Sequence, residues 1–101
     1  MVIWLDESAY NLAKSVDFSE LDSHIRFNDS NNSIELDEEP IVQEDYFGKK
    51  FEEKPIWIML GCISDEVILS GLSADQNKVL PRGRELYNLY DSIYYSLPVK
   101  Q

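Results

Sequence analysis

Hydrophobic positions recur at helical spacing near the start of the chain. Between Ala9 and Val16 the apolar residues are spaced by three and four, and Asp6 or Ser8 can cap the helix that this pattern predicts. A second, shorter helix is expected to begin at Ser19, because two acidic residues follow in its first turn.

The clearest helical pattern lies near the end of the chain. From Arg84 to Leu97 the apolar residues form one stripe, and Pro98 is expected to end the helix. The positions predicted to face the core are Leu86, Leu89, Ile93 and Leu97.

The most apolar run, from Ile56 to Ile63, has only eight residues, so periodicity cannot decide between a strand and a helix. A short helix is expected to follow from Asp65 to Leu72 and to end near Gly71. Pro81 and Gly83 are then expected to break or kink the path of the chain.

Polar residues dominate the middle of the chain. The segment from Asn28 to Ser33 consists only of Asn, Asp and Ser, and it predicts a loop because these side chains compete for backbone hydrogen bonds. The alternation from Ile34 to Leu36 favours a short strand, and Pro40 interrupts the segment that follows it. Four apolar residues are then expected to hold the segment on the body of the protein: Ile41, Val42, Tyr46 and Phe47.

These patterns predict a mainly α fold, a small helical bundle formed by one domain over residues 1–101. The alternative is an α+β domain in which Val2–Leu5, Ile34–Leu36 and Ile56–Ile63 form a short sheet. A chain of 101 residues fits one domain, and a hydrophobic content of 44% is high enough to build a core.

The excess negative charge is confined to the first half of the chain. Residues 1–47 contain twelve acidic and two basic residues, a net charge of −10, whereas seven acidic and seven basic residues cancel in residues 48–101. No Lys or Arg stands between Arg26 and Lys49. Such a concentration of like charge steers cationic partners toward the protein. The seven acids in this interval are Asp29, Glu35, Asp37, Glu38, Glu39, Glu44 and Asp45.

The composition also limits partners and location. An isoelectric point near 4.3 argues against nucleic acid and anionic membrane, which both carry negative charge. The first residues lack the basic and apolar regions of a signal peptide, and no apolar run is long enough to span a bilayer. The single cysteine, Cys62, is expected to be buried and inert. Without a disulfide, a cytoplasmic protein is expected.

No arrangement of residues points to catalysis, a metal ion or a cofactor. His24 is the only histidine, and the chain has no phosphate-binding loop or serine nucleophile motif. Asp29-x-Asn31-x-Ser33 opens like a calcium loop but lacks the Gly and Glu that such a loop needs further on. We therefore expect no catalytic residue, no metal site and no cofactor. A small enzyme of unknown chemistry is the least favoured alternative.

The helix expected from Arg84 to Leu97 has a second face. Tyr87, Asp91 and Tyr94 are spaced by four and three, and Tyr95 lies next to them. Tyrosine supplies a large contact area at low entropic cost and is enriched in interfaces. This face can bind a partner, or its tyrosines can widen the core stripe, and the spacing supports both interpretations equally.

Two segments resemble immunity proteins. Asp91-Ser-Ile-Tyr-Tyr95 resembles the Asp-x-Ile-Tyr-Tyr segment of the colicin nuclease immunity proteins, in which two tyrosines and surrounding acids bind the toxin's nuclease domain; Ser96 stands where that family has Pro. The region from Ser64 to Tyr95, with Gly71-Leu-Ser73 and Arg84-Glu-Leu-Tyr87, is similar to small immunity proteins of contact-dependent and polymorphic toxin systems. The resemblance implies a cytosolic protein that binds and blocks a cognate toxin.

The charge and the resemblance together predict an immunity protein of bacterial competition that neutralises a basic toxin domain, a nuclease, through an acidic surface. A nuclease holds phosphates on a cationic surface, and carboxylates presented in their place compete for it. The alternative is an acidic DNA mimic that inhibits a phage-defence nuclease. The residues predicted to bind the partner are the seven acids between Arg26 and Lys49, together with Tyr46, Tyr87, Asp91, Tyr94 and Tyr95. The oligomeric state is left open.

Overall fold

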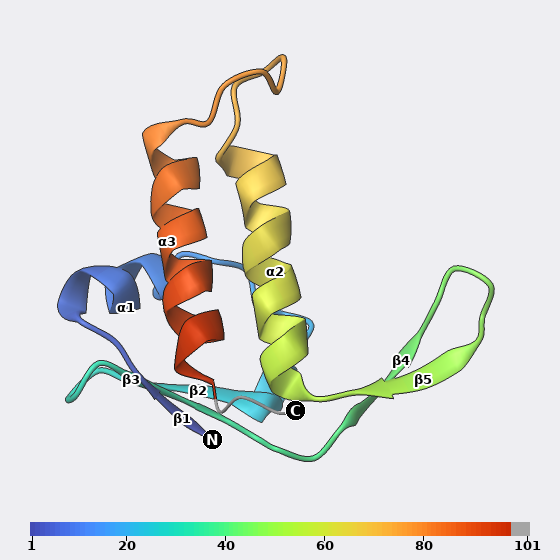
Figure 1. Cartoon of the computed structure of the whole chain (residues 1–101). Helices are drawn as coiled ribbons and strands as arrows, with labels where there is room; N and C mark the ends of the chain where they lie inside the picture. Colours follow the sequence, from blue (N-terminus) through green and yellow to red (C-terminus); the bar gives the residue numbers. More distant parts are fainter. Residues whose placement is uncertain (98–101) are drawn as a thin grey trace.

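The computed structural model describes residues 1–97, and these residues form three α-helices, one 3-10 turn and five β-strands (Figure 1). The prediction of a mainly α bundle is therefore wrong, because the fold is α+β. Along the chain the elements are β1 (Val2–Trp4), α1 (Glu7–Lys14), η1 (Asp22–His24), β2 (Ile25–Asn28), β3 (Ser33–Leu36), β4 (Ile41–Glu44), β5 (Lys50–Glu53), α2 (Pro55–Ser70) and α3 (Pro81–Ser96).

A three-stranded antiparallel sheet is formed by the first half of the chain, in the order β1-β3-β2. Ile3 pairs with Ile34, which pairs with Phe27, so these side chains share one face of the sheet and join the hydrophobic core. Trp4 is exposed on the opposite face. The strand expected at Ile34 is confirmed, and so is helix α1, whose first turn is capped by a hydrogen bond from Ala9 N to Asp6 Oδ1.

The prediction of a second short helix beginning at Ser19 is wrong. This segment contains only the one-turn helix η1 and continues as strand β2. The alternation of partly buried and exposed residues from Ile25 to Asn28 suits a strand that covers the core with one face. Phe18 and Leu21, which precede this turn, are nevertheless buried in the core.

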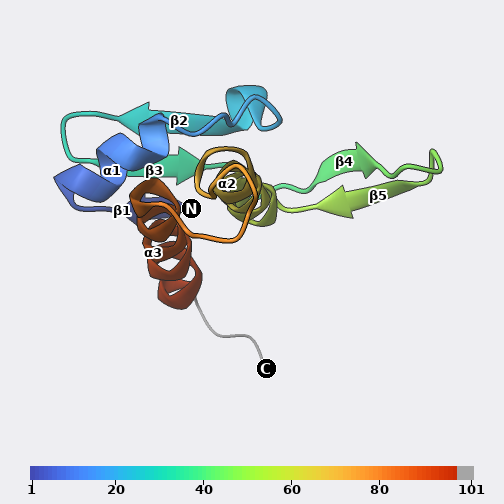
Figure 2. The ribbon, with the colours of Figure 1, turned by 90° about the horizontal axis from the view of Figure 1, so that it is seen from above.

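Helices α2 and α3 stand side by side with one end of each near the sheet (Figures 1 and 2). The apolar run of undecided structure is the first half of α2, and the helix expected from Asp65 is its continuation. Pro81 starts α3, since a first-turn position needs no backbone N–H, and therefore does not break the chain path. Leu86, Leu89 and Ile93 are buried as predicted, and Leu97 partly so, whereas Pro98 lies outside the described residues. Within residues 1–97, no helix is long and apolar enough to cross a membrane.

Backbone contact between two glycines joins the far ends of α2 and α3. A Cβ atom added to Gly83 would overlap the carbonyl oxygen of Gly71 and lie 2.8 Å from its carbonyl carbon. Leu80 N also donates to Gly71 O at 2.8 Å. Gly83 therefore allows the backbones of the two helices to touch. The predicted kink at Gly83 is wrong, because α3 runs through this residue as one helix.

Strands β4 and β5 form a separate two-stranded hairpin that projects away from the helices and the main sheet (Figures 1 and 2). We call residues Ile41–Glu53 the arm. Its turn is closed by hydrogen bonds from Asp45 N to Lys49 O at 2.9 Å and from Gly48 N to Asp45 O at 3.0 Å. Gly48 has a positive φ of 79°, which the bulged hairpin turn requires and glycine adopts without strain.

The expectation that four apolar residues hold this segment on the body is wrong. Val42, Tyr46 and Phe47 are exposed along the arm, and only Ile41, at its base, packs partly against the core. The hairpin turn directs the chain out and back before the apolar residues can reach the core.

Candidate functional site

Asp29 is the first of the predicted partner-binding acids, and it is paired within the protein. It accepts hydrogen bonds from Tyr10 Oη at 2.6 Å and from Lys14 Nζ at 2.7 Å. These bonds, that from Lys14 most strongly, lower the pKa of the Asp29 carboxyl. Burial, together with the neighbouring carboxylate, raises the pKa of Tyr10 to about 12, so the phenol stays protonated and donates. Asp29 therefore anchors the β2–β3 loop to α1.

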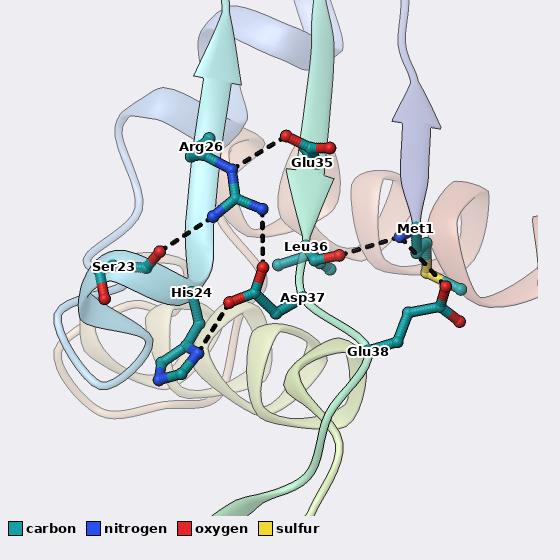
Figure 3. Close-up of polar contacts among 8 residues, drawn as sticks. All are labelled: Met1, Ser23, His24, Arg26, Glu35, Leu36, Asp37 and Glu38. Atoms are coloured by element: carbon teal, nitrogen blue, oxygen red, sulfur yellow. Dashed lines mark hydrogen bonds and ion pairs between the residues drawn. The ribbon is translucent and has the colours of Figure 1, made fainter.

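Glu35 and Asp37 surround the only arginine of the first half of the chain (Figure 3). Arg26 Nε donates to Glu35 Oε1 at 2.9 Å, and Arg26 Nη2 donates to Asp37 Oδ1 at 2.7 Å. The Nδ1 atom of His24 lies 3.0 Å from Asp37 Oδ2. Hydrogen bonds from Arg26 and then His24 lower the pKa of the Asp37 carboxyl. Both acids thus serve to hold β2 and β3 together.

Acidification is expected to destabilise the fold as Asp29 and Asp37 become protonated. Their folded-state pKa values lie below the ordinary 3.8, so their pairs contribute fully above that value and are lost as the pH falls through the lower folded values. The urea midpoint of Asp37→Asn should be lower than that of the wild type at pH 7 and should fall less below about pH 4. An equal fall in both proteins would show that Asp37 contributes nothing to the acid sensitivity.

Glu38 and Glu39 lie between the sheet and the arm. A carboxylate oxygen of Glu38 is 3.7 Å from the N-terminal ammonium of Met1, which donates to Leu36 O at 2.9 Å (Figure 3). Glu38 also lines a hollow of about 230 Å³ at the foot of the arm, whose wall includes Trp57. Glu39 is exposed and has no ion-pair partner within residues 1–97.

The two remaining acids of the interval lie on the arm. Asp45 Oδ1 accepts from Phe47 N at 2.9 Å and from Lys49 N at 2.8 Å, so this carboxylate shapes the turn. Glu44 stands opposite Lys50 across the hairpin. Both side chains are exposed.

An aromatic pair forms the tip of the arm. Tyr46 is 96% exposed and Phe47 is 89% exposed, and their rings meet edge to face with centroids 5.4 Å apart. Val42 and Phe51 add exposed apolar surface further down the arm. The sequence prediction treated both Tyr46 and Phe47 as anchors to the body, counted only Tyr46 as a binding residue, and omitted Phe51.

The predicted second face of α3 is exposed over its whole length. Tyr87, Asp91, Tyr94 and Tyr95 all face solvent rather than the core. The Tyr94 ring lies 6.3 Å from the ring of Trp57 on α2, a residue that the sequence prediction missed. Trp57 is exposed although it belongs to the most apolar run of the chain. Its exposure follows from the helical structure of that run, which the sequence pattern left undecided.

The single thiol and the grouping of possible metal ligands can be described for residues 1–97. Cys62 is buried as predicted, and burial, followed by the nearby Glu20 carboxylate, raises the pKa of its thiol to about 12. The thiol is therefore protonated at neutral pH and is a poor nucleophile. Among the residues that the structure describes, no three or more His, Cys, Asp or Glu side chains are grouped to hold a metal ion.

No family model, curated protein or solved structure matches this chain. Its function must therefore be inferred from the residues and their geometry. The predicted binding residues are distributed over four parts of the fold: the paired acids of the sheet and its β2–β3 loop, the segment with Glu38 and Glu39, the arm, and the exposed face of α3. The acidic interval is thus not one free acidic surface, because three of its seven carboxylates neutralise Lys14 and Arg26.

Proposed function

We propose that this protein is a cytoplasmic immunity protein that binds and neutralises a basic toxin domain of the nuclease class, with the arm as its main contact. The observation that supports this most directly is the tip of the arm. Tyr46 and Phe47 are almost fully exposed there, next to carboxylates, and they pack against no part of the body.

An exposed aromatic pair on a projecting hairpin suits binding better than folding. A two-stranded hairpin is marginally stable by itself in water, so the arm adds little to the stability of the body. Aromatic residues are enriched among the few that dominate binding energy, and they act from the centre of an interface. The tip offers such a centre, and it reaches beyond the surface of the body (Figure 1).

The charges around the tip favour a cationic partner. Glu39, Glu44 and Glu52 are exposed on or beside the arm, and neither Glu39 nor Glu52 is engaged in an ion pair within residues 1–97. Rim carboxylates raise the association rate with a basic protein through steering. The alternative of a DNA mimic has less support, because a mimic needs an array of free carboxylates, and those of Asp29, Glu35 and Asp37 are paired internally.

Replacing both tip residues with serine should abolish tight binding without unfolding the protein. Tyr46→Ser with Phe47→Ser removes two exposed rings, and a hot-spot residue contributes about 2 kcal/mol or more, so affinity should fall by at least about 30-fold. Titration with purified nuclease toxin domains of the source genome measures the affinity, and growth protection on co-expression measures neutralisation. Trp4→Ser is the matched control, since Trp4 is an exposed aromatic residue on the outer face of the sheet.

The thermal midpoint should stay unchanged in all three proteins. Failure of the wild-type protein to bind any such toxin domain would overturn the proposed function. Wild-type affinity in the tip variant would instead place the interface elsewhere, with the face of α3 as the remaining surface.

A further inference from the structure

Strand β5 is complementary to itself in the antiparallel direction. Together with the residue before it, the strand reads Lys49-Lys50-Phe51-Glu52-Glu53, two cations, one aromatic residue and two anions. If two such strands run antiparallel with their Phe51 residues opposite each other, every Lys lies opposite a Glu. Opposite charges placed across neighbouring strands stabilise the pairing, and aromatic pairs do so as well.

The outer edge of β5 is open for such pairing. Within residues 1–97 its only neighbour in the sheet is β4, so one side of its backbone is left unpaired there. The arm projects from the body, and no other described element runs alongside it (Figure 2). The side chains of Lys50, Phe51 and Glu52 are all exposed.

The backbone of β5 directs the N–H and C=O groups that a second strand would need away from β4. Lys49 turns its carbonyl toward β4, where it accepts from Asp45 N. This direction alternates along a strand, so the N–H and C=O groups of Lys50 and Glu52 point away from β4. In the register that places Phe51 opposite Phe51, Lys50 of one copy faces Glu52 of the other. These two outward-pointing residues can exchange both of their hydrogen bonds, and the two-fold symmetry repeats the exchange.

Neighbouring registers fail on charge. The smallest shift that preserves outward hydrogen bonding is two residues, since a one-residue shift would place an outward group opposite an inward one. A shift in one direction places Lys50 opposite Lys50, and a shift in the other places Glu52 opposite Glu52. Like charges directly opposite each other are destabilising. Backbone direction and side-chain charge therefore select the same register.

We propose that two copies of this chain associate through β5 to form a four-stranded antiparallel sheet in the order β4-β5-β5-β4. The occupant of the open edge is a second copy, because the charges of β5 are complementary to β5 itself, as a two-fold symmetric contact requires. The pairing also supplies the additional strands that an isolated hairpin lacks. The contact is far smaller than the interfaces of about 1,200–2,000 Å² that hold stable complexes, so the dimer is weak and depends on concentration.

This proposal is independent of toxin binding. A lysine on an edge strand is also a common device that prevents pairing with other chains, and the two roles predict opposite results. The dimer requires both signs of charge on β5, whereas a protective role is served by either sign.

Charge exchange on β5 tests the proposal. Sedimentation from about 10 μM to about 1 mM, the range of weak association, should show the wild-type protein approaching twice the monomer mass of 11.7 kDa. An acidic variant, Lys49→Glu with Lys50→Glu, and a basic variant, Glu52→Lys with Glu53→Lys, should each associate at least about tenfold more weakly. An equimolar mixture of the two variants should restore the dimer, because each Glu again faces a Lys.

A cysteine at the symmetry axis provides a second measurement that leaves the charges unaltered. This matters because Lys50 also faces Glu44 within the arm, and the acidic variant can loosen the hairpin. Phe51→Cys should form a covalent dimer on mild oxidation, since the two Phe51 positions form a non-hydrogen-bonded pair, in which opposed Cα atoms are about 4.5 Å apart, within the range that a disulfide spans. Val42→Cys, on the other strand of the arm, is the control and should not do so. The buried thiol of Cys62 is common to both variants.

A monomeric wild-type protein throughout the concentration range would overturn the proposal. Two further results would do the same: dimers that persist in either charge variant, and a mixture that stays monomeric. Equal cross-linking by Phe51→Cys and Val42→Cys would indicate random collision and would also exclude the β5 register.

Discussion

Gly83→Ala should destabilise the fold by about 3 kcal/mol, at the upper end of the usual cost of overpacking. The new Cβ would overlap the carbonyl oxygen of Gly71, and the nearest atoms of Gly71 are backbone atoms that cannot rotate away. The ends of α2 and α3 would have to separate, which disturbs the buried residues between them. Urea unfolding followed by circular dichroism measures the loss.

Gly61→Ala is the matched control for this prediction. Gly61 also lies inside a helix, but a Cβ added there would have no neighbour within 4 Å. Alanine in a helix interior is favoured over glycine by about 1 kcal/mol, so this variant should be more stable than the wild type. If both variants lost the same stability, close contact between the helices would not be the reason that Gly83 is glycine.

Ile93→Ala should cost about 2–5 kcal/mol, the range measured for large-to-small changes in a core. Ile93 is fully buried on α3, and removing its side chain leaves a cavity among residues of the sheet and helices. Its neighbour Tyr94 is exposed, and its ring lies beside the rings of Trp57 and Tyr90, so Tyr94→Ala should cost less than about 1.5 kcal/mol. Thermal and urea unfolding of the two variants provide the comparison. Similar losses would mean that Tyr94 belongs to the core and is not available to a partner.

The helical parts of the fold were predictable because their signals are local. The stripe of α3 and the capped start of α1 each depend on residues within a few turns. Helix α2 was harder to predict, since its first half is apolar on nearly every side and therefore has no amphipathic pattern. Over so few residues, an apolar segment of a helix gives the same sequence pattern as a buried strand.

The arm could have been found from its turn. Asp45 and Gly48 occupy the two positions that define a bulged hairpin turn, and they lie between two short segments of mixed polarity. The interpretation of Tyr46 and Phe47 as anchors to the body gave hydrophobicity priority over turn chemistry. In the structure the turn decides the path, and the apolar residues are carried outward.

The fate of the acidic interval could not be predicted from local sequence. Asp29 meets Tyr10 and Lys14, which precede it by 19 and 15 residues, and Asp37 meets Arg26 only because β2 and β3 are paired. Which carboxylates remain free depends on strand register. The exposed face of α3, by contrast, could be predicted from local sequence. The spacing of Tyr87, Asp91 and Tyr94 correctly placed these residues on one side of the helix.

The separation of the arm from the body makes its turn a natural point at which to divide the chain. A break after Phe47 would leave the three-stranded sheet and α1 on one fragment and the α2–α3 pair on the other. Their shared core, with Ile34 from the first fragment and Met59 from the second both fully buried, would hold the fragments together. Exposed loop tips are also the sites that tolerate cleavage and circular permutation. The same point divides the charge, −10 before it and zero after it, so the fold pairs a strongly anionic half with a neutral one.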